Sequence, residues 1–98
     1  MAINLRLDSE TEHHATELGR THEWLGALDW ILSLDEGLYP LCIQLGREER
    51  VTDTKTLAEQ LELAYQITPP TDEHANNIID RLLDLLGVGH QGETVTIE

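Results

Sequence analysis

Apolar and polar side chains alternate along residues 3–7, with Ile3, Leu5 and Leu7 on one side. This alternation is typical of a half-buried strand. Residues 94–97 are all β-branched, which favours a second short strand. Because an isolated two-stranded ribbon is only marginally stable in water, we expect the two terminal strands to be able to pair and to cover a helical core.

Between these strands the apolar spacing is helical. Ser9 and Glu12 have the spacing of a capping box, which predicts that a helix begins at Ser9. From there to about residue 34 one face carries the apolar residues Ala15, Leu18, Leu25, Leu28 and Leu32. His22 lies on the same stripe, which predicts a buried histidine. Gly19 weakens the middle of this segment, so one long helix and two shorter ones are both open, and the pair is favoured because Thr21 can cap the second piece.

Three further segments follow. Residues 40–48 begin with a proline suited to a first helical turn, but the alternation of Leu41, Ile43 and Leu45 suits a strand equally. Residues 57–67 form a helical pattern with several possible N-caps at residues 52–54, and a proline pair stops it. Residues 71–87 are the clearest amphipathic helix, with Thr71 as the predicted cap and Gly87 at its C-terminal end.

These elements predict a mostly α protein. We expect residues 1–98 to form a single-domain helical bundle of four to five helices, with short N- and C-terminal β-strands that can pair. The exposed edges of such a ribbon could also pair across a dimer axis, so a homodimer is a further expectation.

The balance of acidic and basic residues excludes some classes of function. Nineteen acidic residues stand against six basic ones, which gives a net charge of −13. Direct binding of nucleic acid or of anionic lipid requires clustered Lys and Arg, so neither is expected. Only Arg47, Arg50 and Lys55 cluster, and acidic residues interleave with them.

Other sequence features bear on location and redox chemistry. No secretory signal or membrane-spanning run is recognisable, which predicts no membrane association. Cys42 is the only cysteine and lies among apolar residues, so we expect it to be buried and unreactive. Together these features predict a cytoplasmic protein.

No motif predicts an enzyme or a cofactor. Glu10 and His13 have the Glu-x-x-His spacing of di-iron bundles, but the second motif is absent and the segment is polar, so we expect a surface helix. Glycines at positions 87, 89 and 92 match dinucleotide-binding spacing, but they follow a helix and precede a strand, which is the wrong context.

The acidic segment 8–36 and one tryptophan are the candidate interaction residues. The segment contains only Arg20 as a basic residue, and its predicted contact carboxylates are Glu10, Glu12, Glu17 and Glu23. Trp30 lies further from the apolar stripe than Trp24, so it is the candidate exposed anchor. We therefore expect a non-enzymatic protein–protein interaction module, whose protein partner could be basic.

Two alternatives remain open. The acidic surface could mimic nucleic acid and inhibit a basic DNA- or RNA-binding protein, which steep salt dependence would reveal. The histidine-rich first helix could instead support a small metal-binding or carrier-type activity, which metal analysis would test.

Overall fold

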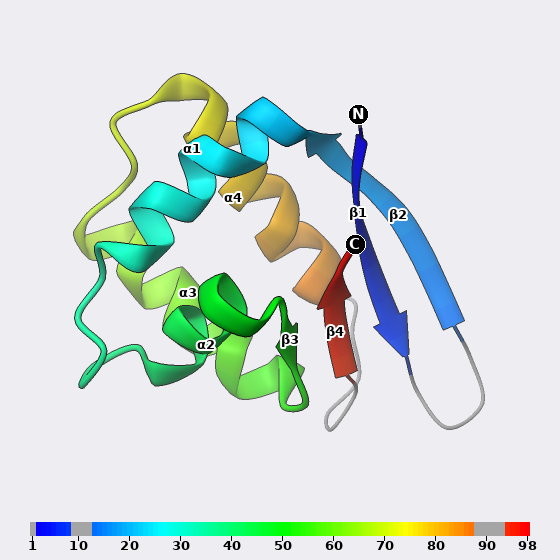
Figure 1. Cartoon of the computed structure of the whole chain (residues 1–98). Coiled ribbons are helices and arrows are strands. Elements are labelled where there is room, and N and C mark those ends of the chain that lie inside the picture. The colour runs from blue at the N-terminus through cyan, green and yellow to red at the C-terminus, as the bar shows by residue number, and fades with distance from the viewer. Residues whose placement is uncertain (1, 9–12, 88–93) are drawn as a thin grey trace.

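The computed structural model describes residues 2–8, 13–87 and 94–98, which form four helices and a four-stranded sheet (Figure 1). The strands are β1 (Ala2–Asp8), β2 (His13–Arg20), β3 (Arg50–Val51) and β4 (Thr94–Ile97). The helices are α1 (Thr21–Leu32), α2 (Pro40–Glu48), α3 (Thr54–Ile67) and α4 (Glu73–Gly87). The sheet lies at the right of Figure 1, and the helices extend from it to the left.

The two terminal strands pair with each other, as predicted. In the antiparallel ladder of β1 and β4, Leu5 lies opposite Ile97 and Leu7 lies opposite Val95. β2 pairs along the other side of β1, and β3 pairs along the other side of β4. The strand order is therefore β2-β1-β4-β3, with every neighbouring pair antiparallel.

The prediction of a mostly α bundle is wrong, because the terminal ribbon is the centre of a larger sheet. The chain has an α+β fold, in which four helices pack beside a four-stranded antiparallel sheet. Two of the four strands, β2 and β3, were not predicted from the sequence. β3 is only two residues long, and its pairing with β4 defines it.

The main error concerns residues 13–20, which form β2 where a helix was expected. The inward positions of β2 include Thr16, which lies opposite the buried Leu5, and Leu18, which is 1% exposed. This strand gives β1 a second hydrogen-bonded neighbour and buries Leu18. The free energy gained from these long-range contacts outweighs the weak helical preference of the local sequence. The capping box at residues 9–12 lies outside the described residues.

The break that the sequence predicts near Gly19 has a structural reason. The register between β1 and β2 shifts between Ile3 and Asn4, so β2 carries a bulge next to Gly19. A Cβ atom at Gly19 would overlap the Cδ1 atom of Ile78 on α4. The glycine therefore lets α4 approach the sheet closely. α1 then begins at Thr21 with Arg20 as its N-cap residue, so the prediction of Thr21 as the cap is wrong.

The remaining helices agree with the sequence pattern. Residues 40–48 are helical, which resolves the choice between helix and strand, and Pro40 occupies the first turn. The Asp53 carboxylate caps α3 by accepting from the backbone N–H of Thr56. At the start of α4 it is the Asp72 carboxylate that accepts from the Ala75 N–H, so the cap lies one residue after the predicted Thr71.

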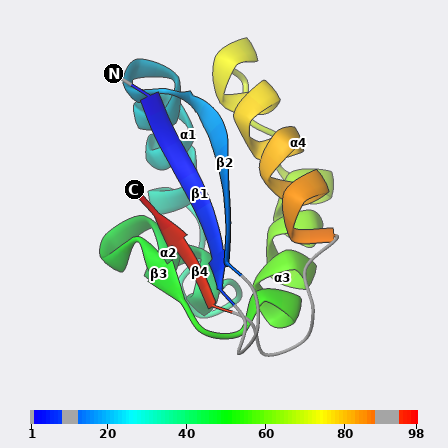
Figure 2. The same cartoon turned by 90° about the vertical axis from the view of Figure 1, so that its right-hand side faces the viewer.

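The sheet has one buried face and one open face. Buried apolar side chains from all four strands meet the helices, namely Leu5, Leu18, Val51, Val95 and Ile97. The opposite face carries exposed residues such as Arg6, Ala15, Glu17 and Arg50. In Figure 2, β1, β2 and β4 lie in front of α1, with α2 to the left of the strands and α3 and α4 to their right. The open face of the sheet is therefore polar, as is usual for an antiparallel sheet covered on one side.

Candidate functional site

The predicted acidic helical surface over residues 8–36 is not a single helical face. Glu17 is exposed on β2, and Glu23 lies in the first turn of α1, while Glu10 and Glu12 lie outside the described residues. The structure thus places the two described carboxylates, Glu17 and Glu23, on different elements. The helical premise of the predicted acidic surface is wrong, although no observation tests whether the individual residues bind a partner.

Glu23 has a defined local role at the N-terminus of α1. Its Oε1 accepts from the backbone N–H of Arg20 at 3.0 Å, and its Oε2 lies 3.6 Å from Nδ1 of His74 on α4. The His74 ring in turn meets His22 edge-on, with ring centroids 6.2 Å apart. The predicted burial of His22 is wrong, because this side chain is exposed. Glu23 therefore helps to hold the first turn of α1 beside α4.

The histidine-rich first helix behind the metal or carrier alternative does not exist, because His13 belongs to β2. A strand places residues four apart at different heights along the sheet, so the helical spacing of His13 and Glu17 no longer applies. Among the described residues, no group of three or more His, Cys, Asp or Glu side chains is arranged to hold a metal ion.

Cys42 is buried in α2, as predicted, with 0% exposure. Burial raises the pKa of its thiol to about 12. The thiolate is the reactive form of cysteine, so this environment suppresses nucleophilic chemistry at Cys42.

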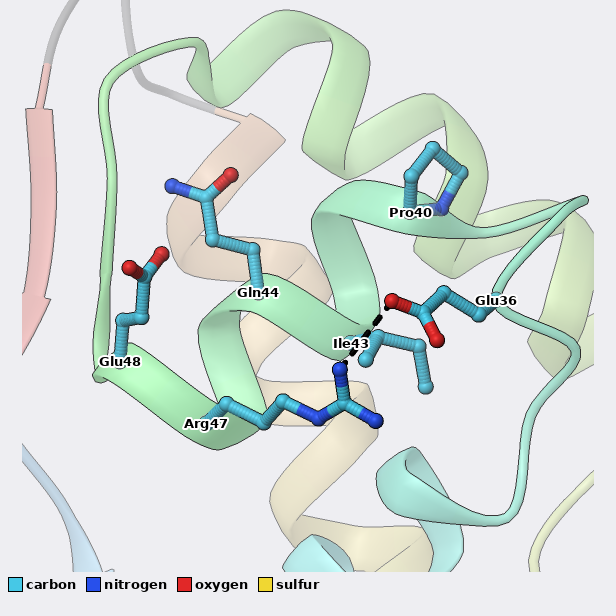
Figure 3. Close-up of a pocket in the computed structure, with 6 residues that line it drawn as sticks. All are labelled: Glu36, Pro40, Ile43, Gln44, Arg47 and Glu48. Atoms are coloured by element: carbon cyan, nitrogen blue, oxygen red, sulfur yellow. Dashed lines mark hydrogen bonds and ion pairs between the residues drawn. The ribbon is translucent and has the colours of Figure 1, made fainter.

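A surface hollow of about 350 Å³ lies along α2 and is lined by Glu36, Pro40, Ile43, Gln44, Arg47 and Glu48 (Figure 3). Arg47 reaches over Ile43 to Glu36, with an N–O distance of 3.1 Å. These two side chains are 61% and 64% exposed, so water screens their attraction. Arg47 and Glu36 are therefore paired with each other and exposed to water. The residues that line the hollow include no buried acid or base that could perform proton transfer.

Trp30, the predicted anchor, connects α1 to the end of α3. Its side chain is half-buried, and its indole N–H donates to the Thr68 carbonyl at 2.8 Å. A second link joins the start of α2 to α3, because the Leu41 N–H donates to the Gln60 side chain at 2.9 Å. These two hydrogen bonds hold the end of α1, the 33–39 connection and the last half of α3 at the left of Figure 1, away from the sheet.

Four large apolar side chains are exposed on these segments: Leu32, Leu38, Leu63 and Ile67. We call this set the apolar end. Leu32 lies two residues after Trp30, and Ile67 directly precedes Thr68. Leu38 lies three residues before Leu41, and Leu63 lies three residues after Gln60.

The exposures of these side chains are unusually high for large apolar groups. They range from 45% for Leu32 to 67% for Leu38, with 50% for Leu63 and 64% for Ile67. Single exposed leucines are ordinary, but several on adjoining segments are typical of an interaction surface.

The segments that carry the apolar end bear charges of one sign, although Arg47 of α2 reaches Glu36 from outside them. Residues 29–39 and 59–68 contain no Lys or Arg. They contain five acidic residues, all exposed: Asp29, Asp35, Glu36, Glu59 and Glu62. Segments that expose both apolar side chains and carboxylates can contact a surface that is both apolar and cationic.

The apolar end was missed from the sequence. The predicted inner face of α3 contains Leu57, Leu61 and Ala64, and all three are buried. Leu63 and Ile67 lie off that face but are four residues apart, so a helix places them together on another side. These apolar residues on a second face of the helix were the sequence signal that could have identified the apolar end.

No described helix is both long and apolar enough to cross a bilayer. No model of a protein family, no curated protein and no solved structure matches this chain.

Proposed function

We propose that this protein is a non-enzymatic binding module, which holds a basic amphipathic segment of a partner protein on its apolar end. The observation that carries the proposal is the exposure of Leu32, Leu38, Leu63 and Ile67 on segments that are joined by two hydrogen bonds and that also carry exposed carboxylates. The single cysteine is a free and buried thiol, which suits a role in the reducing cytoplasm.

The chemistry of the partner follows from the two parts of the surface. The exposed leucine and isoleucine side chains favour apolar contacts with a partner, because burial removes their area from water. The exposed carboxylates of these segments and the net charge of −13 attract Lys and Arg and speed the encounter. A helix with leucines on one side and lysines on the other offers both features at the spacing of helical turns.

A designed probe tests this proposal. The probe is a short amphipathic peptide made of Leu and Lys, and its affinity for the full chain is measured by calorimetry. The double variant Leu63→Ser and Ile67→Ser removes two side chains that are half or more exposed, so its fold should be unchanged. If the probe buries the remaining exposed area of both, their loss costs about 2 kcal/mol, or about a 30-fold weaker Kd.

Leu25→Ser is the matched control. Leu25 is 53% exposed on α1, but it lies two helical turns before Leu32, or about 10 Å along the axis. We expect its Kd to stay within about twofold of the wild-type value. Equal weakening by the control and the double variant would refute the proposal, because the probe would then respond to exposed leucine in general.

Salt dependence separates this function from mimicry of nucleic acid. Apolar docking with charge assistance should weaken moderately with salt and keep a salt-resistant component. Binding that disappears at high salt, and is unchanged by the double variant, would indicate a purely electrostatic surface and would contradict the proposed use of the apolar end.

A further inference from the structure

The two edge strands of the sheet, β3 and β2, differ in length and in the partners of their outward backbone groups. β3 is two residues long, and the side-chain amide of Gln44 donates to the outward carbonyl of Arg50 at 3.2 Å. β2 is eight residues long, and β1 is its only neighbour in the described sheet. An open strand edge of this length is a template for pairing with another strand. The structure therefore closes one edge and leaves the other available.

The hydrogen-bond alternation identifies which groups of β2 point outward. Asn4 exchanges both backbone hydrogen bonds with Glu98, at 2.9 and 2.8 Å, so its polar groups face β4. In an antiparallel ladder the direction alternates, which turns the backbone groups of Leu5 toward β2 and its partner Thr16. The N–H and C=O groups of Ala15 and Glu17 must then point away from β1, to the open edge.

We propose that a second copy of this chain pairs antiparallel along β2, which forms a continuous eight-stranded sheet in a homodimer. Ala15 of one copy then lies opposite Glu17 of the other, and Thr16 lies beside the two-fold axis. This register pairs outward backbone groups with outward groups. It also keeps the side chains of Ala15 and Glu17 together on the open face of the sheet, because directly opposed residues share a face.

Charge complementarity supports a second copy as the occupant. Arg6 lies opposite Ala15 in the observed ladder. In the dimer, Arg6, Ala15 and Glu17 of the second copy form one row, with Arg6 and Glu17 two strand spacings, or about 10 Å, apart. The small Ala15 leaves room for these two long side chains to meet above it. Within one copy Arg6 donates from Nε to Asp8 and from Nη1 to Glu98, and a guanidinium group has further N–H donors for a third carboxylate.

The dimer and the proposed capture of a basic segment respond oppositely to salt. Two copies, each with a net charge of −13, repel each other, so salt should strengthen the dimer by screening. Binding of a cationic segment should weaken under the same change.

Sedimentation equilibrium of the full chain at low and high salt tests this inference. The wild-type protein should dimerise at high concentration, more tightly at high salt. Ala15→Pro removes an outward N–H and breaks no bond of the β1 ladder, and should weaken dimerisation by about tenfold or more. Ala2→Pro, at the exposed first residue of β1, is the matched control and should leave the dimer unchanged.

Two further measurements keep the inference testable if Ala15→Pro fails to fold. Glu17→Lys places a cation near Arg6 of the second copy and should also weaken the dimer by about tenfold. In the wild-type protein, hydrogen exchange at the amides of Ala15 and Glu17 should slow as concentration rises. A monomer at all salt concentrations, or a dimer unaffected by both variants, would overturn the proposal.

Discussion

The indole N–H of Trp30 donates a 2.8 Å hydrogen bond to the backbone carbonyl of Thr68, 38 residues further along the chain. The Trp30 ring also meets Tyr65 edge-on, with centroids 6.5 Å apart, and the Tyr65 hydroxyl donates to the side-chain oxygen of Asn76 on α4. This chain of contacts joins α1, α3 and α4, two of which carry residues of the apolar end. The half-buried Trp30 therefore positions the proposed binding surface.

Replacing Trp30 with Phe tests this positioning role. The variant keeps a ring against Tyr65 and removes the donor to Thr68, so the free energy of unfolding should fall by about 1 kcal/mol. Urea denaturation followed by circular dichroism measures the change. An unchanged free energy of unfolding would show that the hydrogen bond does not stabilise the fold.

Gly19→Ala tests the close approach of α4 to the sheet. The added methyl would overlap the Cδ1 atom of Ile78, which is buried and has little room to rotate. We expect a loss of about 1–3 kcal/mol. Gly87→Ala is the control, because a Cβ there meets no described atom within 4 Å. It should be neutral or stabilise α4 by up to about 1 kcal/mol. Equal effects of the two variants would contradict this packing.

The capping carboxylate of Asp53 predicts a pH dependence. Hydrogen bonds from the backbone and side chain of Thr56 lower the pKa of Asp53 below its ordinary 3.8. A lowered folded-state pKa means that the stabilisation is present above the unfolded pKa and is lost as the pH falls through the folded value. Wild-type protein should therefore lose more stability than Asp53→Asn on acidification below about pH 4. Parallel curves for the two proteins in urea titrations would refute this role.

Cys42 should be inert in the folded protein. Since burial raises its pKa to about 12, the thiol stays protonated at neutral pH and is shielded from reagents. Labelling with a chromogenic disulfide should proceed only through unfolding, at a rate that rises with urea. The raised pKa also means that its contribution to stability is complete below the ordinary thiol value and declines as the pH rises above it. Rapid labelling of the native protein would contradict the buried placement.

The parts of the fold that the sequence predicted are those with strong local periodicity. The alternation at Leu5 and Leu7 and the amphipathic pattern around Ile78 and Leu82 identify β1 and α4 without knowledge of their partners. β2 escaped prediction because Ala15 and Leu18 happen to fit a helical stripe, while its strand pattern depends on the ladder with β1. The spacing of apolar residues within one segment does not reveal its pairing with another strand.

The candidate surface depended even more on long-range contacts. Trp30 was predicted to be an exposed anchor, but it is half-buried, and its hydrogen bond to Thr68 depends on how α1 and α3 pack. Leu38 and Leu63 are 25 residues apart in the sequence, and only the fold brings their segments to one end. Their spacing alone does not indicate a shared surface.

The most direct test of the proposed binding surface is an NMR titration of isotope-labelled protein with the Leu and Lys peptide. We predict that the largest chemical-shift changes occur in residues 29–39 and 60–68, around Leu38 and Ile67, while the open face of the sheet changes little. Changes centred on β1, β2 and β4, with the apolar end unaffected, would contradict the account.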